Sequence, residues 1–403
     1  MGIYQLITPV ISLAFSLTAA AFQTSISKFV ASEIENADHS HRNTYKPLIM
    51  GISVSVPLAM ILALILFFGS DLIASSYLQE PRTGILIKLL SFTLPTSAAH
   101  ACINGYYYGI RKASVPAYTQ LLEQLFRVTS VYILSSVLLR SHQNPPLWIA
   151  VIGLIVGELI GLIVSLFMLL RKYSTDKYHS PASLSTPLTY SALFSMLIPL
   201  SANRICMNAL LSLEATALPN ALRRYGLDHS TALSVYGVLT GMAFPLVFFP
   251  NALTTSVSIL LLPEISANMS SNKITKIKKS IIQSIEYCSF LGIFCMGFFL
   301  FAGNIIGRRI FHSELAGYFI AQLSFLCPFL YLNTTLSGII QGLGKTIPLF
   351  IFNILSLLLR LGMIFFTVPT IGIKGYLLGL LFSQILLTFL CLIILFSKKS
   401  LQK

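Results

Sequence analysis

The chain has 403 residues; 55% of them are hydrophobic, only 10% are charged, and the mean hydropathy is +0.80. Soluble domains carry about 25% charged residues, so this composition excludes a soluble enzyme and indicates an integral membrane protein. The formal net charge of +14 comes mostly from basic residues in short loops between apolar segments. Such residues set membrane orientation, and we therefore do not expect nucleic acid as a partner.

Apolar segments of about 20 residues, the length of a membrane-spanning helix, recur along the whole chain. They predict an all-α polytopic membrane protein with eleven visible transmembrane helices. Between the sixth and seventh spans we expect a polar loop over residues 213–232. The expected spans are Tyr4–Val30, Pro47–Phe68, Ile85–Tyr107, Pro116–Leu139, Leu147–Leu170, Leu188–Ser212, Ser234–Leu262, Ile281–Phe301, Tyr318–Ile340, Pro348–Val368 and Gly372–Phe396.

The lysine and arginine residues of the loops predict the orientation of the chain. One set of loops carries sixteen of them and the opposite set carries eight. Because cytoplasmic loops hold the excess of basic residues, we expect a multi-pass protein of the cell membrane with its C-terminus in the cytoplasm and its N-terminus outside. The three remaining basic residues, Arg127, Arg204 and Arg360, lie inside spans.

The sequence also repeats itself. At an offset of 231, the run Thr24–Ser27 matches Thr255–Ser258 in three of its four residues. At an offset of 233, seven identities occur in one register, and they predict an internal duplication. The matched pairs are Ser91 and Ser324, Phe92 and Phe325, Pro95 and Pro328, Gly105 and Gly338, Gly109 and Gly342, Lys112 and Lys345, and Arg127 and Arg360.

The repeat predicts the domain organisation. The offset covers six helices, so the two halves share one membrane orientation, an arrangement found in transporters with a substrate site between the halves. We expect an N-terminal bundle of five spans over residues 1–172, a cytoplasmic linker over 173–187 and a C-terminal bundle of six spans over 188–403. The partner of Leu188–Ser212 would fall before residue 1. Either the coding start is set too late or the chain has truly lost its first helix.

Arg204 is the first candidate for substrate binding. A guanidinium without a counter-charge in hydrocarbon costs several kcal/mol, so we expect Arg204 to face a bundle interior or a wet cavity. Ser201, Asn208 and Ser212 lie with it on one stripe of a helix. Arg127 and Arg360 occupy equivalent positions in the two halves. Together the three arginines predict a cationic cavity for an anionic substrate such as a diphosphate, to which guanidinium donates bidentate hydrogen bonds.

Acidic residues offer a competing explanation for part of this charge. Glu123 lies one turn before Arg127 and could neutralise it as an i,i+4 pair. Glu158 aligns with Gln384 at an offset of 226, so only one half carries that charge. Glu123 and Glu158 are candidates for ion coupling, although a hydrogen bond between helices is the simpler interpretation of Glu158.

Other patterns favour packing over chemistry. Gly105 with Gly109 and Gly338 with Gly342 are GxxxG pairs, which are typical of closely packed membrane helices. The six cysteines lie in apolar spans without CxxC spacing, so neither a metal nor a disulfide is expected. The sequence shows no catalytic constellation and no nucleotide-binding glycine loop. We expect neither an enzyme nor a cofactor.

Three stretches, residues 101–128, 198–219 and 236–266, carry a resemblance to a known family. The first reads ACINGYYYGIRKASVPAYTQLLEQLFRV, the second IPLSANRICMNALLSLEATALP and the third YGVLTGMAFPLVFFPNALTTSVSILLLPEIS. They resemble the stage V sporulation protein B family of polysaccharide-biosynthesis transporters, part of the multidrug/oligosaccharidyl-lipid/polysaccharide (MATE-like) superfamily. The similarity extends over essentially the whole chain.

The resemblance implies a fold and a function. The implied fold is two six-helix bundles around a central cavity. The implied function is flipping of undecaprenyl-diphosphate-linked peptidoglycan or polysaccharide precursors in cell envelope or spore cortex biogenesis. The implied partners are a lipid-linked oligosaccharide, membrane lipids and proteins of cell envelope synthesis. Relatives usually have about fourteen helices, so this chain would lack the first and the last two.

Two other functions fit the same fold. A cation-coupled multidrug antiporter is the main alternative. Antiporters of organic cations favour acidic or aromatic pockets, whereas this chain carries an intramembrane arginine in both halves, which favours the flippase. A membrane scaffold in envelope assembly is the third reading, and only a transport assay would exclude it.

Overall fold

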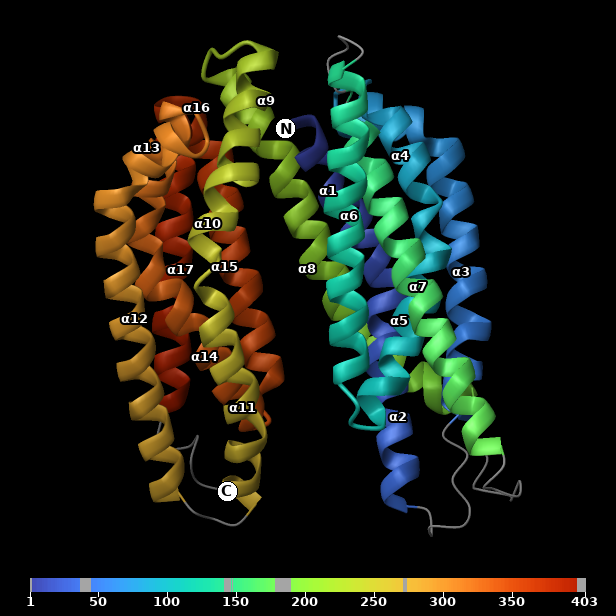
Figure 1. Ribbon diagram of the computed structural model, residues 1–403. Coiled ribbons are helices and arrows are strands. Elements are labelled where there is room, and N and C mark those ends of the chain that lie inside the picture. Colours follow the sequence, from blue (N-terminus) through green and yellow to red (C-terminus); the bar gives the residue numbers. More distant parts are fainter. Residues whose placement is uncertain are drawn as a thin grey trace. The chain divides into compact units, whose positions relative to one another are not determined.

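The computed structural model describes residues 2–36, 45–140, 146, 148–177, 190–270 and 274–396. Within these ranges the chain is helical apart from short turns, and no strand occurs there. The chain forms two compact units, which we describe separately: an N-terminal unit, Leu6–Ser212, and a C-terminal unit, Met1–Gln5 with Leu213–Lys403. Within each unit the axes of the long helices are roughly aligned (Figure 1).

The N-terminal unit contains most of α1 and seven further helices, the last of which continues into the other unit. A π-helical turn, Ser16–Ala20, joins α1 to α2, and a second one, Ile73–Tyr77, follows α3. The helices are α1 (Gly2–Phe15), α2 (Ala21–Asn36), α3 (Tyr45–Leu72), α4 (Thr83–Ser91), α5 (Thr93–Gly109), α6 (Ser114–Arg140), α7 (Trp148–Lys177) and α8 (Tyr190–Arg224).

The C-terminal unit contains the end of α8 and nine further helices. Two of them begin at a polar N-cap: the Asp228 carboxylate accepts from the Thr231 amide, and the Ser313 hydroxyl accepts from the Ala316 amide. The helices are α9 (His229–Val238), α10 (Phe244–Phe248), α11 (Asn251–Ser270), α12 (Ile274–Arg309), α13 (Glu314–Leu323), α14 (Cys327–Gly342), α15 (Thr346–Phe366), α16 (Val368–Ile371) and α17 (Ile373–Phe396).

The packing of the two units repeats in the register that the sequence predicts. In the N-terminal unit α5 packs against α2, α3 and α7, and α6 packs against α7. In the C-terminal unit α14 packs against α11, α12 and α17, and α15 packs against α17. The helix breaks also correspond: α4 and α5 meet at Phe92 with a bend of 44°, and a 3-10 turn around Phe325 separates α13 from α14. This agreement supports the internal duplication.

The domain division expected from the sequence, with a linker over residues 173–187, stays a prediction. The units separate at Leu213, inside α8. The linker expected over residues 173–187 begins as helix, because α7 continues to Lys177, and the rest of it falls outside the described residues.

Nine described helical segments are long and apolar enough to cross a membrane, and the bent pair Thr83–Ser91 with Thr93–Gly109 makes a tenth. Ten of the eleven expected spans overlap these segments. The remaining span, Leu188–Ser212, falls largely on α8, and α8 is not among the membrane-length segments. The count of eleven transmembrane helices therefore stays a prediction. Large apolar side chains such as Phe68, Phe301 and Phe366 are exposed, as suits helices in contact with lipid.

Two expected boundaries need correction. The seventh span, Ser234–Leu262, is not one helix: the membrane-length segment His229–Phe248 ends before a turn at Phe249–Pro250, and α11 follows. Proline has no amide hydrogen to continue the helical bonding, which accounts for a break there. The polar loop expected over residues 213–232 is also wrong, because α8 continues to Arg224. Buried Ala215, Leu218 and Leu222 give this segment an apolar helical face.

The GxxxG pair of α5 packs closely against α2, as its spacing predicts. A Cβ atom at Gly105 would lie 2.5 Å from the Gln23 carbonyl oxygen, and one at Gly109 would lie 2.6 Å from the Val30 Cβ. Both distances are far below van der Waals contact. Only glycine therefore allows this approach of the two helices.

We expect Gly105→Ala to lower the stability of the detergent-solubilised protein by about 1–3 kcal/mol, the usual cost of overpacking. Gly297 on α12 is the matched control, because no atom lies within 4 Å of a Cβ at that position. Alanine has the higher helix propensity by about 1 kcal/mol, so Gly297→Ala should be neutral or stabilising. Thermal unfolding of the two variants side by side measures the difference. Equal melting temperatures would contradict the close approach.

Candidate functional site

The polar stripe of α8 contacts α2 and the two π-helical turns Ser16–Ala20 and Ile73–Tyr77. The Arg204 guanidinium donates to the Thr24 hydroxyl at 3.0 Å, and the Asn208 amide donates to the Ser16 hydroxyl at 2.7 Å. Farther along the same face, the hydroxyls of Ser212 and Tyr77 lie 3.0 Å apart. The stripe predicted from the sequence therefore faces a polar strip of its own unit, and Ser201, its first member, is half-buried.

Arg204 differs from the other intramembrane arginines in its partners. It is half-buried, and among the described residues its side chain bonds to a hydroxyl and to no carboxylate. Guanidinium has five N–H donors, and the forked arrangement of these donors matches two oxygens of a phosphate. The N–H groups of Arg204 that do not donate to Thr24 are suited to bind an anion.

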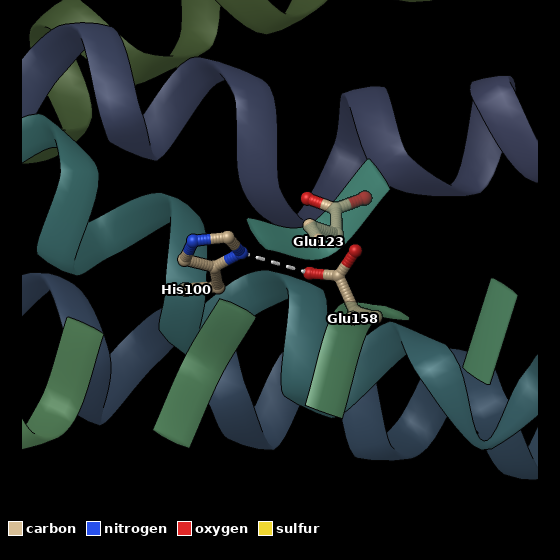
Figure 2. Close-up of side chains that lie close together, drawn as sticks. All are labelled: His100, Glu123 and Glu158. Atoms are coloured by element: carbon tan, nitrogen blue, oxygen red, sulfur yellow. Dashed lines mark hydrogen bonds and ion pairs between the residues drawn. The ribbon is translucent and has the colours of Figure 1, made fainter. Parts of the chain in front are cut away.

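Arg127 belongs to a cluster of charged side chains that three helices bring together. Its guanidinium donates to the carboxylate of Glu123, one turn earlier on α6, as the spacing predicts. The imidazole Nδ1 of His100 on α5 lies 3.1 Å from a carboxylate oxygen of Glu158 on α7. One potential ligand atom each of His100, Glu123 and Glu158 lies within 4.8 Å of the others, and Figure 2 shows these three side chains directed toward one another. We call these four residues the His100 cluster.

Glycines on α7 make this cluster possible. A Cβ atom at Gly157 would lie 2.9 Å from the Glu123 carbonyl oxygen, and one at Gly161 would lie 2.9 Å from the His100 ring. The absence of side chains at these two positions lets α5 and α6 approach α7 beside Glu158. The His100 side chain is only 5% exposed as a result.

Arg360 lies in a second buried ion pair, in the C-terminal unit. Its guanidinium donates to one carboxylate oxygen of Glu214 at 2.5 Å, and the Tyr376 hydroxyl donates to the other at 2.6 Å. The Arg360 and Glu214 side chains are 14% and 8% exposed. Sequence reasoning found Arg360 but missed Glu214, because it placed residue 214 in a loop.

The three intramembrane arginines therefore have three different environments. Arg127 and Arg360 each pair with a carboxylate of their own unit, and Arg204 pairs with a hydroxyl. That the three act together on one diphosphate stays a prediction. His100 was also missed, although it aligns with the polar residue Asn333 at the offset of 233.

A sequence model described as polysaccharide biosynthesis protein matches residues 1–269, which is more than half of the chain. The chain belongs to the polysaccharide biosynthesis protein family. A second model, described as MatE, matches residues 224–366. One relative of the chain is the stage V sporulation protein B of Bacillus subtilis (strain 168), which is 27% identical over 396 residues, or 97% of this chain and 76% of the relative.

Solved structures show that the chain has a MATE-like transporter fold. The lipid II flippase MurJ in an inward closed conformation superposes with a TM-score of 0.72 at 14% identity, covering 99% of this chain and 82% of that one. A multidrug resistance MATE family transporter of the MOP superfamily, facing inward, gives 0.69 at 15% identity, covering 97% and 88%. The resemblance and the fold class predicted from the sequence are confirmed.

Proposed function

We propose that the chain is a membrane flippase, and not an enzyme, that moves undecaprenyl-diphosphate-linked peptidoglycan or polysaccharide precursors across the cell membrane by alternating access. Its family and its structural likeness to a lipid II flippase support this proposal. The observation that carries it is Arg204, a half-buried intramembrane guanidinium whose only side-chain partner in the described part of the chain is a hydroxyl.

The α8 stripe supplies the proposed contacts to the diphosphate. The donors of Arg204 not used by Thr24 bind two phosphate oxygens, which balances charge in a medium of low polarity. Asn208 and Ser201 lie on the same face and add neutral hydrogen-bonding groups. Arg127 and Arg360 also bind the diphosphate, in conformations of the transport cycle in which their ion pairs with Glu123 and Glu214 are broken.

Rescue of a bacterial strain depleted of its own precursor flippase tests the proposal. Expression of the full chain should restore growth and deplete the precursors that accumulate on the cytoplasmic side. If the chain reaches the membrane but the precursors stay as abundant as in the strain without it, the proposal is contradicted.

A multidrug antiporter is the second candidate function, and the carboxylates of the His100 cluster are the observation that favours it. The solved MATE transporter has the same fold. Such an antiporter would extrude an organic cation such as ethidium in exchange for a coupling ion. Faster ethidium efflux from cells that express the chain, without rescue of the flippase-depleted strain, would select this function.

We propose that the C-terminus lies in the cytoplasm, since the loops on that side carry twice as many basic residues. Lys276 and Arg223 are both exposed. Under the expected orientation Lys276 lies on the cytoplasmic side of the membrane and Arg223 on the outer side. In intact cells, Lys276→Cys should be shielded from an impermeant thiol reagent and Arg223→Cys should be labelled. The parent chain, whose native cysteines are buried or half-buried, supplies the background. The reverse labelling pattern would invert the orientation.

A further inference from the structure

The His100 cluster has an imbalance of charge that its surroundings must correct. It contains two carboxylates, Glu123 and Glu158, but only one permanent cation, Arg127. With a neutral imidazole at His100 the cluster would carry one uncompensated negative charge. The four residues lie on helices expected to cross the membrane, where an unpaired charge is strongly unfavourable. One additional positive charge would remove this cost.

The geometry of the cluster favours a proton over calcium or magnesium as that charge. Calcium takes about six to eight oxygen ligands and magnesium requires near-octahedral geometry. The cluster offers the oxygens of two carboxylates, and Arg127 and His100 already occupy one oxygen of each. A divalent ion would also overshoot the single missing charge. A proton between His100 Nδ1 and the Glu158 carboxylate, 3.1 Å apart, needs no further ligand.

In the C-terminal unit, neutral residues occupy the positions of His100, Glu158 and Glu123, while Arg360 occupies that of Arg127. Asn333 occupies the position of His100 at the offset of 233, and Gln384 occupies that of Glu158 at the offset of 226. The Asn333 amide donates to the Gln384 side-chain oxygen at 2.8 Å. Ser356, at the position of Glu123, donates to the Ser383 carbonyl oxygen at 2.9 Å. A neutral pair thus suffices to join these helices, so packing alone does not explain the titratable pair.

Neighbouring helices do not supply the missing charge. The charged groups that act on Glu123 are Glu158, Arg127 and His100. On α3 and α4, Asp71 and Lys88 pair with each other. The other charged residues on the helices packed against α5 lie at positions outside the cluster: Lys28, Glu33 and Glu35 on α2, Lys46 on α3, Arg140 on α6, and Arg171, Lys172, Asp176 and Lys177 on α7. The His100 Nε2 atom is buried and has no hydrogen-bond partner among the described residues, which leaves the second ring nitrogen available for a proton.

We propose that the His100 cluster is a proton-binding site that takes up one proton per chain, shared by His100 and Glu158. When the proton is bound, Glu123 and Arg127 form a balanced pair. When it leaves, the net negative charge of the cluster holds Arg127 more firmly. Proton uptake thereby makes Arg127 more available to an anion. This coupling to transport rests on the proposed function, whereas proton binding does not.

The double variant His100→Asn with Glu158→Gln tests proton binding without any substrate. It copies the Asn333–Gln384 pair, so the hydrogen bond between the helices is kept while both titrating groups are removed. Infrared difference spectra of the full chain in lipid, taken between about pH 5 and 8 where histidine sites change charge, should show imidazole and carboxyl bands in the wild type that the double variant lacks. Glu286→Gln, which removes an exposed carboxylate on α12, should retain them.

The single variant Glu158→Gln keeps His100 in place and guards against a folding defect in the double variant. It should lose the carboxyl band and retain the folded state. If the wild type and the double variant give the same pH-difference spectrum, the cluster binds no proton in this range and the proposal fails. It also fails if the wild type gives these bands on addition of sodium at fixed pH and not on a change of pH, because the site would then bind a metal cation.

Transport in proteoliposomes tests the coupling separately. A pH gradient should accelerate wild-type flipping of a fluorescent undecaprenyl-diphosphate-linked sugar and should have no effect on the double variant. Equal responses of the two proteins would overturn the coupling. A wild type that flips no substrate would instead contradict the proposed function, and the infrared result would still decide whether the cluster binds a proton.

Discussion

Replacing Glu214 by alanine is expected to lower the free energy of unfolding by about 3–5 kcal/mol, because it leaves a buried guanidinium without its counter-charge. Arg360 and Glu214 are 14% and 8% exposed, and Tyr376 completes the hydrogen bonding of the carboxylate. Denaturant unfolding of the protein in mixed micelles measures this loss. The variant should also be recovered in lower yield.

The chain supplies a matched control for this prediction. Glu314 pairs with Arg308 at 3.1 Å, but both side chains are mostly exposed, at 81% and 69%. Exposed pairs contribute about 0–1 kcal/mol, so Glu314→Ala should change stability little. If the two variants unfolded at the same denaturant concentration, burial would not determine the strength of the Arg360–Glu214 pair.

Replacing Arg204 by alanine is expected to slow flipping by about ten- to hundred-fold while the protein still reaches the membrane. A hydrogen bond to a charged group contributes about 1.5–3 kcal/mol, and each 1.36 kcal/mol corresponds to a tenfold change in rate. Arg204→Lys should restore only part of the activity, since an ammonium is a point charge and lacks the planar fork.

Arg223→Ala serves as the control for Arg204, because it removes an exposed arginine from the last turn of the same helix. Its flipping rate should equal that of the wild type. An Arg204→Ala protein with full activity would show that this residue has only a structural role. Loss of the folded protein in Arg204→Ala, with Arg204→Lys stable and fully active, would lead to the same conclusion.

The fold was largely predictable, because its main determinants are local or repeated in the sequence. Apolar segments long enough to cross a bilayer predicted the helices. The register that pairs Phe92 with Phe325 predicted an internal duplication, and the helix breaks at these two positions correspond. The Glu123–Arg127 pair was predictable as well, since residues four apart share one face of a helix.

The site was predictable only in part, because the partners of its polar residues come from distant segments. Glu214 was read as a loop residue, since the polar residues after Ser212 obscured the apolar face that continues α8. His100 gave no local signal, because its partner Glu158 lies on another helix. Only the alignment of both positions with Asn333 and Gln384 connects them in the sequence.

The flipping rate of an undecaprenyl-diphosphate-linked sugar in proteoliposomes tests the central claim most directly. A fluorescent label on the sugar is bleached by a membrane-impermeant reductant only after the lipid reaches the outer leaflet. We expect the purified chain to accelerate bleaching of the diphosphate-linked lipid well above protein-free liposomes, and Arg204→Ala to abolish most of that acceleration. Equal bleaching with and without the folded wild-type chain would contradict the account.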